Sequence, residues 1–119
     1  MMIYCFSCLK NYNQRNPTSC FIAIEDNIVV GAVIAGNDGR RGYIYHLAVN
    51  PRYRNKGIGT ALVNDVMKAL ENLGINKVAL VAFKRNEAAN TFWEKQGFCL
   101  REDINYRNKE IKELVRIDT

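Results

Sequence analysis

The sequence has few of the features that mark membrane-spanning, disulfide-stapled or low-complexity proteins. Its 119 residues include only two prolines, one histidine and one tryptophan. No apolar run approaches the ~18 residues of a membrane span, and no cationic-then-apolar leader precedes a cleavage site. Four cysteines (Cys5, Cys8, Cys20 and Cys99) are too few for a disulfide framework, so reduced thiols are expected. These absences predict a soluble, cytoplasmic protein without a membrane partner.

The length and the charge narrow the class of protein further. One domain, residues 1–119, is expected, because two would each be too small to bury a core without staples. The hydrophobic content of 48% is that of a globular chain. Seventeen Lys and Arg against twelve Asp and Glu give a net charge of +5, and such a surplus attracts anions: nucleic acid, a membrane surface or a phosphorylated cofactor. Arg52, Arg54 and Lys56 crowd into one short stretch.

Three strands joined by tight turns are predicted in the first half of the chain. Apolar runs at 21–24, 28–35 and 42–49 are separated by the turn residues 25–27 and 37–39. Such short connections predict an antiparallel meander. The preceding residues, 1–19, are ambiguous, and four of them are compatible with one weak helical face (Tyr4, Phe6, Leu9 and Tyr12).

The second half of the chain follows a different pattern. Leu62, Val66, Leu70 and Leu73 repeat at helical spacing, and a buried strand is predicted at 77–83. A strand, a helix and a strand in this order predict a right-handed crossover between parallel strands. A second helix is expected over 86–96, capped by Asn86 at its start and stopped by Gly97-Phe98 at its end. One or two strands should follow, around 98–101 and 114–117. The fold class is therefore α/β (α+β), with a mixed sheet that is antiparallel first and parallel later.

The loop from Arg54 to Gly59 is the most informative segment. It joins a strand end to a helix start, where the first backbone N–H groups have no partner within the helix. Gly57 and Gly59 let an anion approach the backbone, and Arg54 and Lys56 add positive charge. The loop therefore predicts a pyrophosphate site.

Two of three known phosphate motifs do not fit this loop. A P-loop needs Lys and Ser or Thr after its last glycine, and a dinucleotide fingerprint needs a third glycine where Leu62 stands. The pattern Arg/Gln-x-x-Gly-x-Gly/Ala is met in full by Arg54-Asn55-Lys56-Gly57-Ile58-Gly59.

This last pattern belongs to the GNAT N-acetyltransferase superfamily. The stretch LAVNPRYRNKGIGTAL, from Leu47 to Leu62, resembles that family's cofactor motif, and NEAANTFWEKQGF, from Asn86 to Phe98, resembles its second motif. The similarity covers roughly residues 21–98. It implies the GNAT acyl-CoA N-acyltransferase fold, with helices on both faces of the sheet and a shortened N-terminal part.

The resemblance also implies the chemistry. The protein would transfer an acetyl group from acetyl-CoA to a primary amine by direct attack on the thioester, without a metal. The pantetheine would lie between the strands at 42–49 and 77–83, paired with the backbone of Leu47 and Val49. The implied cofactor-binding residues are Leu47, Ala48, Val49, Arg54, Asn55, Lys56, Gly57, Ile58, Gly59, Thr60, Asn86 and Trp93. A homodimer is a further possibility.

The catalytic groups depart from the family pattern. Trp93 stands where the family commonly has a tyrosine that protonates the leaving thiolate, and an indole cannot release a proton near neutral pH. His46 would suit a general base, but relatives usually carry the base four or six positions before Val49. Those positions are Tyr45 and Tyr43, which become the catalytic candidates. In a regular strand His46 points to the opposite face from Tyr45 unless a bulge intervenes.

Three rival interpretations are weaker than this one, and metal binding and nucleic-acid binding are not expected. Cys5 and Cys8 form a C-x-x-C, but a closed zinc site needs four ligands and only Cys20, Cys99 and His46 could complete it. A non-catalytic acyl-CoA-binding module would use the same loop without turnover. A nucleic-acid-binding domain is disfavoured, because the sequence offers no aromatic stacking platform or base-reading helix.

Overall fold

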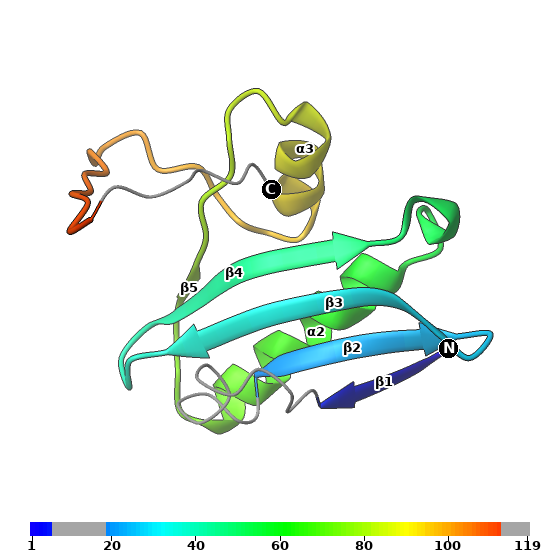
Figure 1. Ribbon diagram of the computed structural model, residues 1–119. Helices are drawn as coiled ribbons and strands as arrows, with labels where there is room; N and C mark the ends of the chain where they lie inside the picture. Colours follow the sequence, from blue (N-terminus) through cyan, green and yellow to red (C-terminus); the bar gives the residue numbers. More distant parts are fainter. Residues whose placement is uncertain (6–18, 113–119) are drawn as a thin grey trace. The chain divides into compact units, whose positions relative to one another are not determined.

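An antiparallel meander forms most of the sheet in the computed structural model (Figure 1). The structure describes residues 1–5 and 19–112. Strands β2 (Cys20–Glu25), β3 (Ile28–Asn37) and β4 (Gly42–Val49) pair in sequence order. Between β2 and β3, Asp26 and Asn27 have φ angles of 53° and 62°, as a two-residue hairpin turn requires. The predicted meander is confirmed.

The N-terminal residues form a strand. Strand β1 (Met2–Cys5) pairs antiparallel with β2, from Met2 opposite Ile24 to Cys5 opposite Phe21, and it lies at the edge of the sheet. The helical face, one possibility for this ambiguous stretch, is therefore wrong at Tyr4. Pairing with a neighbouring strand decides the conformation here, and the spacing of apolar residues within one short segment carries no sign of that neighbour. Phe6, Leu9 and Tyr12 lie outside the described residues.

Helix α2 (Ile58–Asn72) connects β4 to β5 (Val78–Ala79), and these two strands are parallel. The predicted crossover is therefore confirmed. Strand β5 is much shorter than the expected range of 77–83, because its pairing with β4 ends where Tyr43 lies opposite Ala79. An extra residue in β4, Tyr45, follows that point and shifts the register. Such a β-bulge bends its strand and ends pairing.

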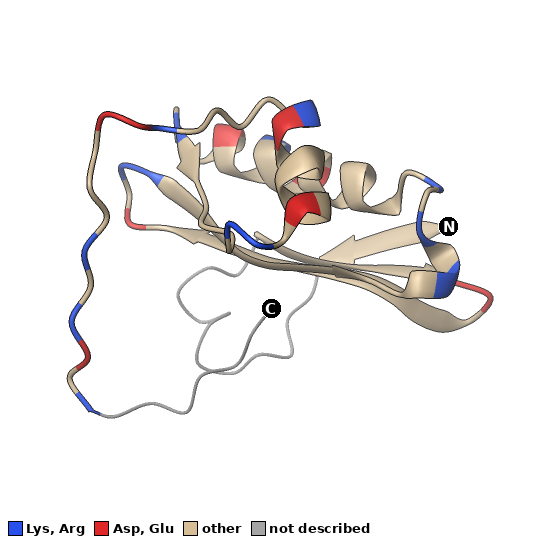
Figure 2. Cartoon of the chain, turned by 90° about the horizontal axis from the view of Figure 1, so that it is seen from above, with Lys and Arg blue, Asp and Glu red and all other residues tan. Residues whose placement is uncertain are grey.

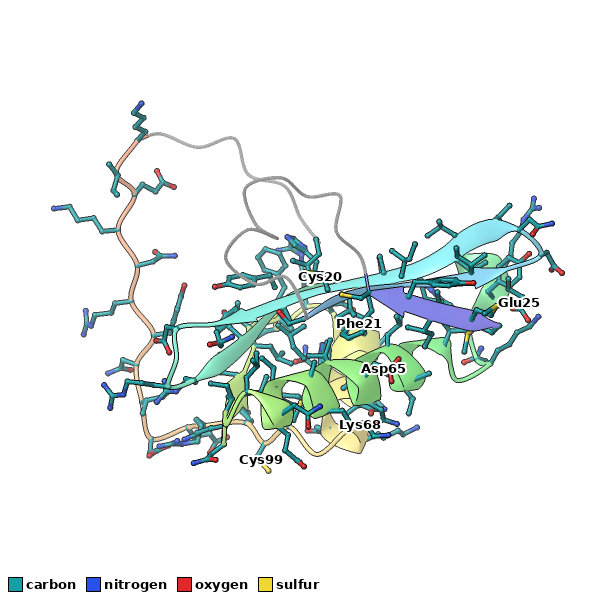
Figure 3. All side chains as sticks on the ribbon, turned by 90° about the horizontal axis from the view of Figure 1, so that it is seen from below. Cys20, Phe21, Glu25, Asp65, Lys68 and Cys99 are labelled. Carbon is teal, nitrogen blue, oxygen red and sulfur yellow. The ribbon has the colours of Figure 1, made fainter. Side chains whose placement is uncertain are left out.

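The core of this part of the chain lies between α2 and one face of the sheet. Leu62, Val66 and Leu70 of α2 are fully buried, whereas Asp65 and Lys68 lie on the outer side of the helix (Figure 3). Phe21 pairs with the buried Val33 and so faces the helix. The expected helix cover on both sheet faces stays a prediction, since α2 is the one α-helix described in this unit.

Contacts divide the chain into two compact units, Met1–Val81 and Ala82–Thr119. The second unit contains α3 (Glu87–Lys95), which begins where the Asn86 side chain accepts a hydrogen bond from the Ala89 N–H at 3.1 Å. It ends at Gly97, whose φ is 92°, with the Phe98 N–H bonded to the Trp93 carbonyl at 3.0 Å. Both predicted helix caps are confirmed.

The strand expected around 98–101 is absent, and residues 98–112 carry no regular secondary structure. Leu100 is 77% exposed, and Arg101 makes two 2.7 Å hydrogen bonds to Asp103. Without a described neighbouring strand in this unit, the backbone has no ladder to join. The strand expected at 114–117 lies outside the described residues. Within the described ranges, neither α-helix combines the length and apolar character needed to cross a bilayer.

Gly31 of β3 allows the first turn of α2 to pack closely against the sheet. A methyl group at this position would lie 3.0 Å from Leu62 Cδ1, 3.1 Å from Ile58 Cγ2 and 3.3 Å from the Ala48 carbonyl oxygen. Gly31→Ala should therefore lower the free energy of unfolding by about 1–3 kcal/mol, as overpacking does. Equilibrium urea unfolding measures this loss.

The matched test removes the nearest of these atoms. Leu62→Val lacks Cδ1, so the Gly31→Ala/Leu62→Val variant should lose less stability than the two single losses added together. Strictly additive losses would contradict the close contact.

Candidate functional site

The loop between β4 and α2 is built by two tight local structures. A 3-10 helix, η1 (Pro51–Tyr53), follows β4, and the Asn50 side chain caps it by accepting from the Arg52 N–H at 3.0 Å. Asn55 then adopts a left-handed φ of 62°, which asparagine tolerates better than most residues. These features turn the chain sharply into the start of α2.

The amino terminus of α2 is open to a ligand. Its N-cap, Gly57, has a φ of 80° and supplies no side-chain oxygen to the first amides, and the first turn holds no acidic residue. A Cβ added at Gly57 would meet nothing within 4 Å. The side chain of Ile58 is buried, so this residue presents only its backbone N–H, with Gly59 and Thr60 next in the same turn. Such a terminus favours an anion.

Three basic residues flank this helix start. Arg54 Nε donates to the Val49 carbonyl oxygen at 3.3 Å, and Lys56 Nζ lies 5.1 Å from the centre of the Tyr53 ring. Arg52 occupies η1 itself. The residues predicted around the anion site from Arg54 to Thr60 therefore lie together in one segment of the first unit.

Within the described residues of the first unit, the edge of β4 beside the loop pairs with another strand only at its beginning. Described pairing with β5 involves only Gly42 and Tyr43. The Asn50 N–H donates to the Val30 carbonyl at 2.7 Å, so Asn50 faces β3. Backbone alternation then directs the groups of Ala48 toward β3 and those of Leu47 and Val49 toward the open edge. An extended ligand can pair with these two residues, whereas Ala48 offers no backbone group there.

A β-bulge in β4 changes the expected direction of its side chains. Ile34 pairs with His46 and the next residue, Ala35, pairs with Ile44, which leaves Tyr45 as the extra residue. The strand is therefore not regular, and the predicted separation of His46 from Tyr45 onto opposite faces does not hold. Pairing between distant strands sets this bulge, which is why the sequence alone could not locate it.

Both tyrosines and His46 lie on the sheet face opposite α2. Gly42 faces Leu70 of α2, so the next residue, Tyr43, faces away from the helix. The Tyr43 and Tyr45 rings are in contact, with centroids 4.7 Å apart, and Tyr45 is 53% exposed. His46 pairs with Ile34, which alternates with the fully buried Ala35. Three polar side chains thus gather on one face of one strand.

Asn86 and Trp93 belong to the second unit, and their positions there have local explanations. The Asn86 side chain caps α3. The Trp93 ring packs edge-on against Phe98 at 5.3 Å and against Phe92 at 5.0 Å. The contact with Phe98 closes the turn at the helix end, as is common for this type of cap. Trp93 therefore has a packing role within its own unit.

No metal centre is found in residues 1–5 and 19–112, where no three His, Cys, Asp or Glu side chains group together. Cys8, the second residue of the C-x-x-C, lies outside these ranges. Cys20 is buried, and its Sγ lies 3.7 Å from the Ala35 carbonyl oxygen. Burial raises the pKa of the Cys20 thiol, which disfavours the reactive thiolate.

Sequence reasoning missed one contact of this site. The Tyr53 hydroxyl donates to Asp26 Oδ2 at 3.4 Å, across 27 residues of sequence. Tyr53 stands inside the glycine-containing motif, which was a local signal that it lies near the loop. Asp26 belongs to a distant hairpin turn and carried no such signal.

Comparisons with known proteins agree with this geometry. The sequence model of the acetyltransferase (GNAT) family matches residues 2–98. N-alpha-acetyltransferase 30 of Schizosaccharomyces pombe is 36% identical over 88 residues, which cover 70% of this chain and 59% of that protein. An acetyltransferase of Sodalis glossinidius is 34% identical over 100 residues, covering 84% and 70% of the two chains.

Solved structures share the fold. Ard1 from Thermoplasma volcanium superposes with a TM-score of 0.72 at 24% identity, over 76% of this chain and 62% of that one. The aminoglycoside N-acetyltransferase AAC(6')-Iy, in complex with CoA, superposes with a TM-score of 0.74 at 19% identity. The superposition covers 85% of this chain and 82% of that one. The family match extends over most of the chain and across both units. The chain belongs to the acetyltransferase (GNAT) family.

Proposed function

We propose that the protein is an N-acetyltransferase that moves an acetyl group from acetyl-CoA to a primary amine. The observation that carries this proposal is the amino terminus of α2, where the Gly57 N-cap leaves open space and no side-chain cap beside Arg54 and Lys56. This terminus suits the pyrophosphate of CoA. Family membership supports the same donor.

The neighbouring edge of β4 suits the rest of the donor. The backbone groups of Leu47 and Val49 can pair with the amides of pantetheine as an added strand would. A neutral amine would then attack the carbonyl carbon of the thioester, forming the C–N bond as the C–S bond breaks. CoA would leave as thiolate, and the nitrogen would give up one proton to water. A thiol with a reference pKa of ~8.5 leaves without a dedicated acid, so the packed Trp93 is compatible with turnover.

The acceptor is proposed to approach the face of β4 that carries Tyr43, Tyr45 and His46. Apart from Glu25 at the end of β2, strands β1 to β4 contain no carboxylate, and between their turns they appear uncharged in Figure 2. A polycation needs several carboxylates to bind tightly. This uncharged face therefore favours an acceptor with a single amine, such as the α-amine of a peptide, over an aminoglycoside.

Three further points belong to the proposal. The two units form one acetyltransferase domain, since the family match crosses the boundary at Val81. The location is cytoplasmic, which suits the thiol state of Cys20 and Cys99. The protein forms a homodimer, for which β1 offers a sheet edge.

The activity is tested with acetyl-CoA and a panel of amines, scored by product mass and released CoA. The panel holds peptides with a free α-amine, peptides with only a lysine amine, and aminoglycosides. We expect acetylation of the α-amine peptides in preference to aminoglycosides. Binding of acetyl-CoA without turnover on any amine would instead support a non-catalytic acyl-CoA-binding module.

The anion site is tested by two matched glycine substitutions at opposite ends of α2. Gly57 and Gly74 have φ angles of 80° and 82°, and a Cβ at either meets nothing within 4 Å. Alanine at either position would therefore be strained by the positive φ to the same extent, by about 1–2 kcal/mol. Only Gly57→Ala places a methyl where the pyrophosphate would lie, so it should weaken CoA binding by about tenfold or more. Calorimetric titration measures the affinity, and equal losses in Gly57→Ala and Gly74→Ala would remove the pyrophosphate assignment.

The acceptor face is tested by the pH dependence of two substitutions. Tyr45→Phe should lower kcat/KM by a similar factor at every pH, because it removes a hydroxyl that orients the amine or a water. His46→Gln should instead lower kcat/KM by about tenfold or more and alter the acid limb of the profile, as loss of a general base does. An unchanged profile in His46→Gln would exclude the histidine and leave the tyrosines as candidates.

A further inference from the structure

The tip of the β2–β3 hairpin is bonded to the loop that precedes α2. Tyr53 Oη donates to Asp26 Oδ2 at 3.4 Å. In Figure 2 the acidic colour of the hairpin turn lies beside the basic colour of η1. This contact joins two segments that are far apart in the sequence, and one of them carries the glycine-containing motif.

The same tyrosine also contacts a charge of the anion site. Lys56 Nζ lies 5.1 Å from the centre of the Tyr53 ring, within the range of a cation–π interaction. A lysine side chain is long and flexible, and an aromatic face restricts it. Asp26, Tyr53 and Lys56 therefore form a chain of contacts, which we call the loop brace, from the hairpin to the helix start.

Electrostatic attraction of the anion does not explain why an aspartate stands at residue 26. A carboxylate near an anion site repels the anion and weakens its binding. The backbone of Asp26 is left-handed, with a φ of 53°. Glycine or asparagine would fit this position of the β2–β3 turn equally well. Burial first, and then the negative charge of Asp26, raise the pKa of Tyr53. A phenol keeps its proton near neutral pH in any case, so the hydroxyl can donate to the carboxylate.

We propose that Asp26 and Tyr53 are positioning residues for donor binding, which hold the loop and Lys56 in the arrangement that receives the pyrophosphate of CoA. The inference rests on the proposed function for the identity of the anion. Neither residue needs to touch the ligand. Asp26 holds the Tyr53 hydroxyl, and the Tyr53 ring in turn restricts Lys56, which would contact the anion.

Two substitutions of Asp26 separate this role from simple electrostatics. Asp26→Asn removes the charge but keeps an oxygen that accepts from Tyr53, whereas Asp26→Gly tolerates the positive φ and removes the acceptor. If charge alone matters, both variants bind CoA more tightly than the wild type. The loop brace predicts that Asp26→Gly binds CoA about three- to tenfold more weakly, the range of one hydrogen bond, and that Asp26→Asn does not.

A double-mutant cycle tests the bond itself. Tyr53→Phe keeps the ring under Lys56 and removes the hydroxyl, so it should weaken CoA binding about as much as Asp26→Gly. The double variant should be no weaker than either single variant by more than about twofold, because both changes break one bond. Glu25→Gln is the matched control, since it neutralises the neighbouring carboxylate of the same turn, and it should leave the affinity within about twofold of the wild type.

The decisive measurements are calorimetric affinities for CoA, with Tm recorded for each variant, and the split between KM and kcat where turnover is present. A positioning role raises KM for acetyl-CoA in Tyr53→Phe while kcat and Tm stay unchanged, whereas general loosening of the fold lowers Tm and kcat together. Unchanged affinity in Tyr53→Phe, or losses that add in the double variant, would overturn the inference. If the wild type itself binds no CoA, the proposed function fails instead.

Discussion

The close packing of α2 on β3 determines where the candidate site lies. Because Gly31 has no side chain, Ile58 and Leu62 approach the strand directly, next to the Ala48 carbonyl. The helix therefore begins beside the end of β4, and its first amides lie close to the open edge of that strand. A longer side chain at residue 31 would move the helix start away from the sheet, and the anion site would move with it.

The bulge at Tyr45 is the second constraint, and it has two consequences. Described pairing between β4 and β5 stops just before it, so Leu47 and the Val49 N–H have no described strand partner on that side, whereas the Val49 carbonyl accepts from Arg54. It also brings His46 to the same face as Tyr43 and Tyr45. One extra residue in a strand thus accompanies both the edge proposed for the donor and the polar face proposed for the acceptor.

What the sequence could predict was set by how local each feature is. The Asn86 and Gly97 caps, the hairpin turns and the loop around Gly57 depend on residues within a few positions of one another, so local rules located them. Strand β1, the end of β5 and the bulge at Tyr45 depend on pairing with distant strands. Strand alternation, the rule that separated His46 from Tyr45, holds only for a regular strand, and the bulge at Tyr45 makes β4 irregular.

The same distinction separates the two halves of the proposed reaction. The proposed donor side consists almost entirely of the contiguous segment from Leu47 to Thr60, so a short motif was sufficient to predict it. The acceptor side uses side chains whose direction depends on the register between β3 and β4, and the placement of Lys56 depends on a hairpin elsewhere in the chain. Donor chemistry can therefore be inferred from the motif, whereas the catalytic group and the acceptor depend on contacts that no short stretch of this sequence contains.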